Sequence, residues 1–200
     1  MGTLWTGRTA QSEDDCMRSY APSQFSLAGN SLYCGNSDAN YGCGMRFPNV
    51  LVPAGKVIDS AFLYCRYRTS KSSTPCNTRI RAQKATNPII FSNEEDFDAR
   101  TWTTEYVNWD AIPAWSANLY YTSPDFAAVI QEVINQPGWA SGQAMVIAWD
   151  DWEERSPNAH REPYSYNGAS TTCPQLQITY SDPPPPSGGG PASLVAAGII

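Results

Sequence analysis

Short stretches of alternating apolar and polar residues, separated by turn residues, are the feature that most constrains this chain. Residues 57–68 and 78–85 alternate in this way, and 16 prolines and 14 glycines mark the turns. The later half of the first stretch turns Ala61, Leu63, Cys65 and Tyr67 to one side. Because side chains alternate between the two faces of a strand, this period of two predicts half-buried β-strands.

The same signals predict further strands and one helix. Ser123 is the predicted N-cap, with Pro124 at the first helical position and Asp125 near the positive end of the helix dipole. Apolar residues then recur at helical spacing over 126–134, and Pro137 with the following glycine ends the pattern. The remaining strands are expected over residues 44–53, 104–109, 144–149, 160–166 and 175–180.

Many short strands with one helix predict an all-β fold, a jelly-roll-like antiparallel β-sandwich with one short α-helix. A length of 200 residues suits one domain, which we expect over residues 1–180. Residues 181–200 would form an extended Pro/Gly-rich linker and an apolar C-terminal docking segment.

Charge and hydropathy exclude some partners. The net charge is −6 and no cluster of Lys or Arg is present, which argues against nucleic acid. No apolar run is long enough to span a membrane, so we expect no membrane partner. The first eight residues lack the apolar core of a signal peptide. We therefore expect a virion or extracellular location, reached without a signal peptide in this chain.

Six cysteines occur without any C-x-x-C pair, and the chain has a single histidine, so a zinc site is not expected. One interpretation pairs Cys34 with Cys43 and Cys65 with Cys76 in local disulfides, leaving Cys16 to join Cys173. The other interpretation is that all six are buried reduced thiols.

The C-terminal tail predicts a component of an assembly. Residues 183–186 are four prolines, 188–190 are three glycines, and an almost purely apolar stretch follows. Such a segment cannot bury enough surface to order itself. We expect it to dock on other copies or on a capsid or assembly protein through Leu194, Val195, Ile199 and Ile200. The alternative is a linker to a further domain.

Several motifs in residues 40–180 resemble those of the DNRLRE-type modules, jelly-roll sandwiches related to carbohydrate-binding modules. These motifs are residues 45–47, 52–55 and 58–63, a tryptophan-bearing strand at 107–109, a Trp-x-x-Gly step at 139–142 after the helix, and Pro-x-Leu-x-Ile-x-Tyr at 174–180. The resemblance implies the fold and a role in adhesion to polysaccharide or in the structure of surface proteins and virions. Its motifs are packing motifs, so they support the fold better than a function.

The segment 149–155 combines tryptophans with four carboxylates. In a sugar-binding hypothesis Trp152 stacks on a pyranose ring, while Asp151, Glu153 and Arg155 hydrogen-bond to its hydroxyls. A second hypothesis is a calcium site formed by Asp150, Asp151 and Glu153, because calcium prefers oxygen ligands. The third interpretation is a charged, solvated loop at the end of a strand.

A second aromatic cluster comprises Trp102, Trp109, Trp115, Tyr120 and Tyr121, and is interpreted as packing more readily than as a sugar platform or protein interface. Catalysis would need a placed acid and base, for which Glu153 and His160 are the nominees. Nothing in the sequence fixes their spacing, so we expect no enzyme, no catalytic residue and no cofactor other than calcium.

The sequence therefore predicts a non-catalytic structural or adhesive protein of a virion, as a capsid decoration or tail-associated component, or of a similar extracellular assembly. The tail would anchor it and the sandwich would display a surface for polysaccharide. The alternative is a carbohydrate-binding module of a secreted polysaccharide-active enzyme.

Overall fold

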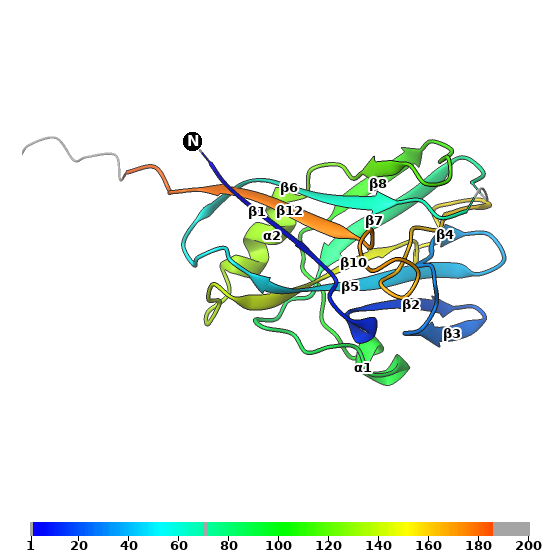
Figure 1. Ribbon diagram of the computed structural model, residues 1–200, viewed down its shortest axis with the longest axis horizontal. Coiled ribbons are helices and arrows are strands. Elements are labelled where there is room, and N and C mark those ends of the chain that lie inside the picture. The colour runs from blue at the N-terminus through cyan, green and yellow to red at the C-terminus, as the bar shows by residue number, and fades with distance from the viewer. Residues whose placement is uncertain (1, 70–71, 186–200) are drawn as a thin grey trace, which may run out of the picture.

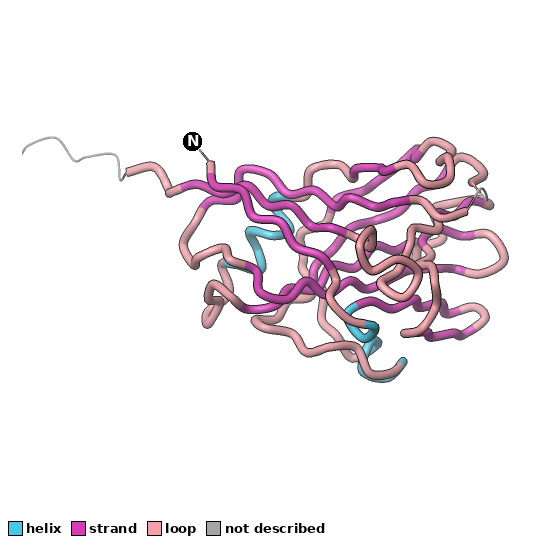
Figure 2. The backbone as a smooth tube through the Cα atoms, in the orientation of Figure 1, coloured by secondary structure: helices cyan, strands magenta, loops and turns pink. Residues whose placement is uncertain are grey.

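The computed structural model describes residues 2–69 and 72–185, which form a sandwich of two antiparallel β-sheets (Figures 1 and 2). The smaller sheet, sheet A, runs in the order β1 (Thr3–Arg8), β12 (Gln175–Ser181), β6 (Val57–Arg66) and β9 (Tyr120–Thr122).

The larger sheet, sheet B, contains the remaining strands. Its order is β11 (Ala159–Arg161), β4 (Cys34–Asn36), β5 (Asn40–Val50), β10 (Gln143–Asp150), β7 (Cys76–Ala82) and β8 (Val107–Ile112). A hairpin of β2 (Asp15–Tyr20) and β3 (Ser23–Ser26) pairs with β5, after a single 3-10 turn, η1 (Ser12–Asp14).

The connections are those of a jelly roll. Taking β1, β5, β6, β7, β8, β9, β10 and β12 as core strands one to eight, sheet A has the order 1-8-3-6 and the matching part of sheet B has the order 2-7-4-5. Successive core strands thus cross between the sheets, except strands four and five, which pair within sheet B, as in two interlocked Greek keys. The hairpin β2–β3 and the strands β4 and β11 are additions to this frame, and all of them lie on sheet B.

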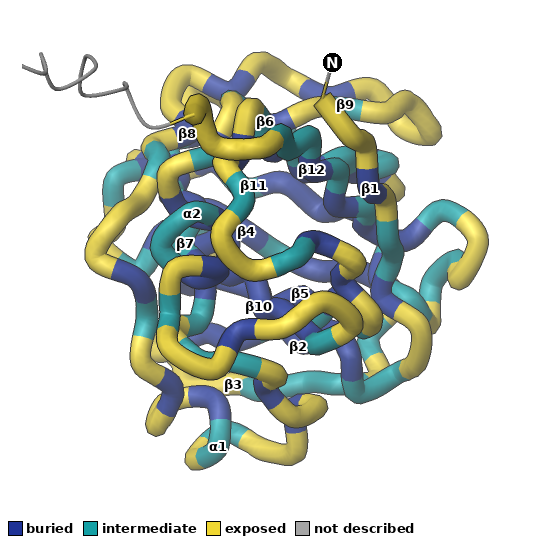
Figure 3. The backbone as a smooth tube through the Cα atoms, turned by 90° about the vertical axis from the view of Figure 1, so that its left-hand side faces the viewer, coloured by how far each residue is buried: buried dark blue, intermediate teal, exposed yellow. Residues whose placement is uncertain are grey.

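The predicted inner faces form the core between the sheets. Leu176 pairs with Leu63 and Ile178 with Ala61 across β12 and β6, and all four are buried. Sheet B supplies Ile80 and further buried residues opposite them. Figure 3 shows β5 and β10 as largely buried strands, with exposed loops around them. Alternation in the sequence therefore located the core correctly.

A stack of aromatic rings fills one part of this core. The Trp109 and Trp149 rings stack with centroids 5.0 Å apart, and Trp115 stacks on Tyr121 at 4.4 Å. The cluster expected from the sequence is thus split: these rings pack in the sandwich, whereas Tyr120 is half exposed on β9.

The long helix, α2 (Ala127–Ile134), is present, but its expected start is wrong. Phe126 is the N-cap and has no side-chain cap bond. The Ser123 hydroxyl instead accepts a hydrogen bond from the Leu63 amide at 2.9 Å, and Asp125 accepts from the Ala61 amide at 2.8 Å. Both side chains attach the connection before the helix to β6, and the N-cap lies three residues later than predicted.

A second apolar layer covers the outer face of sheet B beside a short helix, α1 (Glu94–Asp98), which the sequence did not predict. Phe91, Phe97, Cys16 and Val146 are buried in this layer, and Phe25, Leu27, Trp102 and Trp152 pack against it. Gly44 lets the rings approach the sheet, because a Cβ there would lie 2.5 Å from Phe91.

All six cysteines are unpaired and buried, so the expected disulfides are absent. The β4–β5 register pairs Gly35 with Tyr41, which places Cys34 one residue out of register with Cys43. Cys65 lies on sheet A and Cys76 on sheet B. The interpretation as buried reduced thiols is the one that the structure supports.

Candidate functional site

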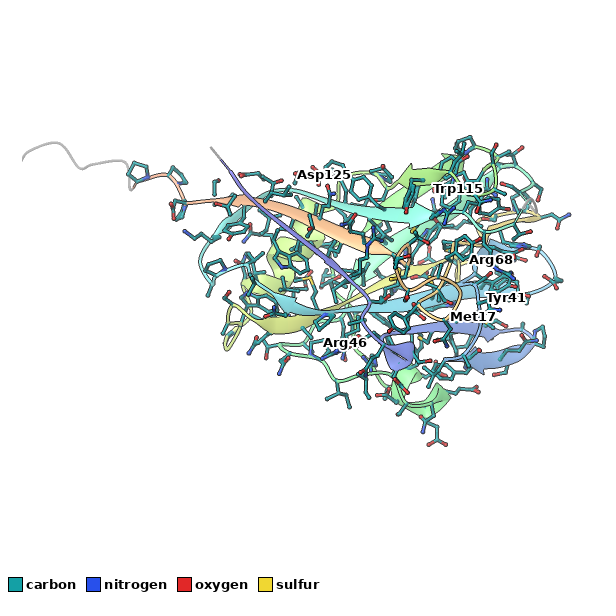
Figure 4. All side chains as sticks on the ribbon, viewed as in Figure 1. Met17, Tyr41, Arg46, Arg68, Trp115 and Asp125 are labelled. Carbon is teal, nitrogen blue, oxygen red and sulfur yellow. The ribbon has the colours of Figure 1, made fainter. Side chains whose placement is uncertain are left out.

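A polar cavity of about 250 Å³ opens where the additions to the jelly roll meet. Its lining comes from the β2–β3 hairpin, the residues that flank β4, the start of β5, and β11 with the residue after it. We call this the tyrosine–histidine pocket, and its lining residues are Met17, Gln24, Tyr33, Asp38, Tyr41, His160 and Glu162. Figure 4 shows Met17 and Tyr41 together at the end of the sandwich opposite the N-terminus.

Strand pairing explains why these distant segments meet. Gly35 of β4 pairs with His160 of β11, and Gly35 has φ +122°, in the region that favours glycine. A Cβ at this position would collide with the carbonyl oxygen of Ala159. The glycine thus permits the close approach that brings Tyr33 and Ser37 to His160.

Three aromatic rings lie close together in the pocket. The Tyr33 centroid is 5.2 Å from that of Tyr41 and 5.8 Å from that of His160, and Tyr41 and His160 are 5.9 Å apart. Such rings present faces that pack well against the C–H groups of a ligand, while their polar atoms form hydrogen bonds.

A continuous chain of hydrogen bonds runs through the pocket. The Tyr41 hydroxyl donates to Asp38 Oδ1 at 3.1 Å, and the Ser37 hydroxyl lies 2.7 Å from the same oxygen. Ser37 Oγ is also 2.7 Å from His160 Nδ1, and His160 Nε2 is 2.7 Å from Glu162 Oε1. Five side chains are therefore fixed relative to one another, from the exposed Asp38 to the buried Glu162.

The surroundings within the pocket shift the pKa values of three of its acidic groups. Burial raises the pKa of Tyr33, and the negative charge of Glu162 adds to the effect. Burial beside Asp38 raises the pKa of Tyr41 to about 12. The hydrogen bond from Ser37 lowers the pKa of Asp38. At neutral pH the pocket therefore holds two neutral phenols and an ionised Asp38 carboxylate.

Two wider hollows lie beside the helices and are poorer candidates. One is lined by Thr104, Glu105, Ala128, Gln131, Glu132 and Asn135, and the other by Asn93, Glu94, Glu95 and Asp98. Neither lining includes an aromatic ring or the histidine. We therefore take the smaller tyrosine–histidine pocket as the candidate site.

The residues expected to bind sugar lie elsewhere. Trp152 is half-buried and packs edge-on against Tyr20 and Phe97, with centroids 5.6 Å away in each case. The guanidinium of Arg81 lies 5.4 Å from its ring centroid. The ring thus has protein contacts on several sides, and its stacking on a sugar stays a prediction.

The three carboxylates of the calcium hypothesis have different protein partners. Asp150 forms an ion pair with Arg81 at 3.0 Å, and burial raises its pKa to about 6. Asp151 accepts hydrogen bonds from the amides of Arg155 and Ser156, at 2.7 and 2.8 Å, whereas Glu153 forms an ion pair with Arg79. Among residues 2–69 and 72–185, no group of three or more His, Cys, Asp and Glu side chains is placed to hold a metal.

Two further expectations concern the docking residues of the C-terminal tail and the nominated catalytic pair. The docking residues Leu194, Val195, Ile199 and Ile200 lie outside the described residues. His160 was nominated as a catalytic partner of Glu153, but its side chain hydrogen-bonds to Ser37 and Glu162 instead. Within the part of the chain that the structure describes, no helix is both long and apolar enough to cross a membrane.

Most of the residues in the pocket were not predicted from the sequence to form a site. Tyr33, Ser37 and Asp38 lie in the first forty residues, outside the motifs that resemble a known family. A weak signal was available, because His160 and Glu162 stand two apart and strand spacing places such residues on one face. Their partners more than 120 residues earlier become visible only through the β4–β11 pairing.

Together these observations define a class: a jelly-roll β-sandwich with a polar, aromatic-lined pocket at one end. A scan against protein-family models finds no match to the chain, and a search of curated proteins finds no significant relative. The resemblance to DNRLRE-type modules therefore stays a prediction.

Proposed function

We propose that this protein binds saccharide through the tyrosine–histidine pocket. The observation that supports this most directly is the joint lining of one cavity by two tyrosine rings, an imidazole and two carboxylates. Aromatic faces suit the C–H surface of a pyranose ring, and fixed acceptors suit its hydroxyls. The size of the cavity suits one sugar unit at the end or along the side of a glycan.

The arrangement of the ends supports display from a larger assembly. Thr3 of β1 pairs with Tyr180 of β12, so both terminal strands leave the body at the same end. The lining residues Met17 and Tyr41 lie at the other end (Figure 4). Attachment through the C-terminal side would leave the pocket facing outward. A virion or surface component and a module of a larger secreted enzyme both fit this arrangement.

Glycan-array screening followed by titration calorimetry tests the saccharide proposal. We expect Tyr33→Ala to weaken binding at least about tenfold, because a stacked ring in a binding site contributes more than 1 kcal/mol. Tyr120→Ala is the matched control, since this exposed tyrosine lies on β9 of sheet A.

Trp152→Ala separates the two sugar-binding hypotheses. Binding that Trp152→Ala abolishes and Tyr33→Ala leaves unchanged would move the site to the segment after β10. Absence of binding to any glycan of a broad array would refute the proposal.

A further inference from the structure

His160 lies between a hydroxyl group and a buried carboxylate. Ser37 Oγ is 2.7 Å from Nδ1, and Glu162 Oε1 is 2.7 Å from Nε2. The Glu162 side chain is only 6% exposed. A nucleophile, a base within hydrogen-bonding reach and a third group that orients the base are the parts of a nucleophilic triad.

The Glu162 carboxylate determines which ring nitrogen of His160 carries the proton, and therefore which nitrogen can accept a proton from Ser37. A carboxylate accepts hydrogen bonds, so Glu162 favours the tautomer with its proton on Nε2. The lone pair of Nδ1 then points at Ser37. In chymotrypsin Nε2 faces the serine, whereas here Nδ1 does. The roles are unchanged, because the nitrogen that faces Ser37 accepts its proton and the other nitrogen donates to the carboxylate.

Ser37 is hydrogen-bonded to two residues that line the pocket, Asp38 and His160. Ser37 is partly exposed and lies in the turn between β4 and β5. The residue after it, Asp38, lines the pocket. Gln24 also lines the pocket, and an amide N–H is a donor of the kind that stabilises an oxyanion. Asp38 is a second acceptor for the Ser37 proton, at 2.7 Å.

We propose that Ser37 is a nucleophile and that the pocket removes O-acyl groups, such as acetyl esters, from saccharides. The sequence favoured a non-catalytic role, and the saccharide part of this inference rests on the proposed function. Ser37 Oγ attacks the ester carbonyl carbon, and its proton moves to His160 Nδ1. The resulting imidazolium is stabilised by Glu162 through Nε2–H.

The sugar hydroxyl then leaves with the proton from Nδ1, so that Ser37 carries the acyl group as an ester. Water attacks this ester and gives one proton to Nδ1. Serine departs with that proton and the carboxylic acid is released. The cycle consumes one ester and one water and needs no other reactant.

The first test is labelling with a small fluorophosphonate, located by peptide mass spectrometry. We expect an adduct on Ser37 that is lost in Ser37→Ala, and a labelling rate about a hundredfold lower in His160→Gln. Ser116, an exposed serine distant in sequence from the pocket, is the internal control. Labelling of Ser37 no faster than that of Ser116 would count against the proposal.

A second measurement tests the proposal in the case that the fluorophosphonate is too large to enter the cavity. The six native thiols are buried, so the Ser37→Cys variant adds an accessible thiol. We expect iodoacetamide to alkylate it at least about tenfold faster than it alkylates a Ser116→Cys variant, with the advantage lost when His160→Gln is added. Equal rates in these variants would overturn the inference.

The outcomes also separate this inference from the proposed function. Saccharide binding without Ser37 labelling would retain the binding site and remove the activity. Labelling of Ser37 and hydrolysis of p-nitrophenyl acetate, without binding to any glycan, would retain the nucleophile and refute the saccharide proposal.

Discussion

Arg155 holds Asp110 through both carboxylate oxygens, with Nη2 2.6 Å from Oδ1 and 2.5 Å from Oδ2. Its other terminal nitrogen donates to the carbonyl oxygen of Thr78 at 2.9 Å. A side chain expected to bind sugar therefore links the loop after β10 to β7 and β8. Its contacts indicate a structural role for this guanidinium.

Arg155→Ala should lower the free energy of unfolding by about 1 kcal/mol, because the pair is partly exposed and solvent screens it. A double-mutant cycle with Asp110→Asn, measured by urea denaturation, isolates the interaction. We expect a coupling of at least about 0.5 kcal/mol. Additive effects of the two changes would show that the contact contributes little.

Thr78→Val should destabilise the core despite its similar shape. Trp149 Nε1 donates to Thr78 Oγ1 at 2.7 Å, and Thr78 donates in turn to the carbonyl oxygen of Trp109. Without the hydroxyl, both buried groups lose their partner, which costs about 1–3 kcal/mol. Thr122→Val on the exposed β9 is the control, and equal losses in chemical denaturation would contradict this account.

Stability should fall as the pH rises through the range set by Asp15. Burial raises its pKa to about 7, against the hydrogen bond from the Tyr166 amide. Between the ordinary value near 4 and about 7, the folded chain keeps a proton that the unfolded chain has released, so a rise in pH favours unfolding.

Asp15→Asn removes this titration and keeps an acceptor for Tyr166. We expect the variant to be roughly 1–3 kcal/mol more stable than the parent at pH 7.5, with a smaller difference at pH 4.5. Urea denaturation at several pH values provides the comparison. The same pH profile for both proteins would show that Asp15 does not have a raised pKa.

Gly44→Ala should destabilise the protein, although alanine usually costs less than glycine inside a strand. The added methyl group would lie 2.5 Å from Phe91 and 3.0 Å from Phe97, and such overpacking costs about 1–3 kcal/mol. Gly29→Ala, where the nearest atom is the Ser31 carbonyl oxygen at 3.3 Å, provides a milder comparison. Thermal denaturation that ranks Gly29→Ala as the worse variant would refute this.

Strands β6, β7 and β12 were predictable because buried residues alternate along each of them. Leu63, Ile80 and Ile178 sit in alternating patterns, and the structure buries all three. The start of α2 was not predictable, because Ser123 accepts from the Leu63 amide of β6 instead of capping the helix, and Asp125 divides its acceptor oxygen between the Ala61 amide of β6 and the Ala127 amide of the helix. Local capping rules cannot anticipate a partner sixty residues away.

The candidate site was harder to foresee than the fold. β2 buries Asp15, Arg18 and Ser19, so polarity along this strand gives no inward face. The residues with the richest local chemistry, 149–155, bind mainly to one another and to β7 and β8. The pocket instead depends on Gly35 and His160 meeting across a three-residue strand pair, a relationship that composition and spacing do not encode.

The pairing of β1 with β12 also has a mechanical consequence. Thr3 lies opposite Tyr180 and Arg8 opposite Gln175, so a pull on both chain ends would peel these strands apart from one end, one rung at a time. A pull between the C-terminal side and the opposite end of the sandwich would load β12 in shear along its pairings with both β1 and β6, where many rungs must break together. The body would therefore resist traction transmitted from a ligand held in its pocket better than traction between its two ends.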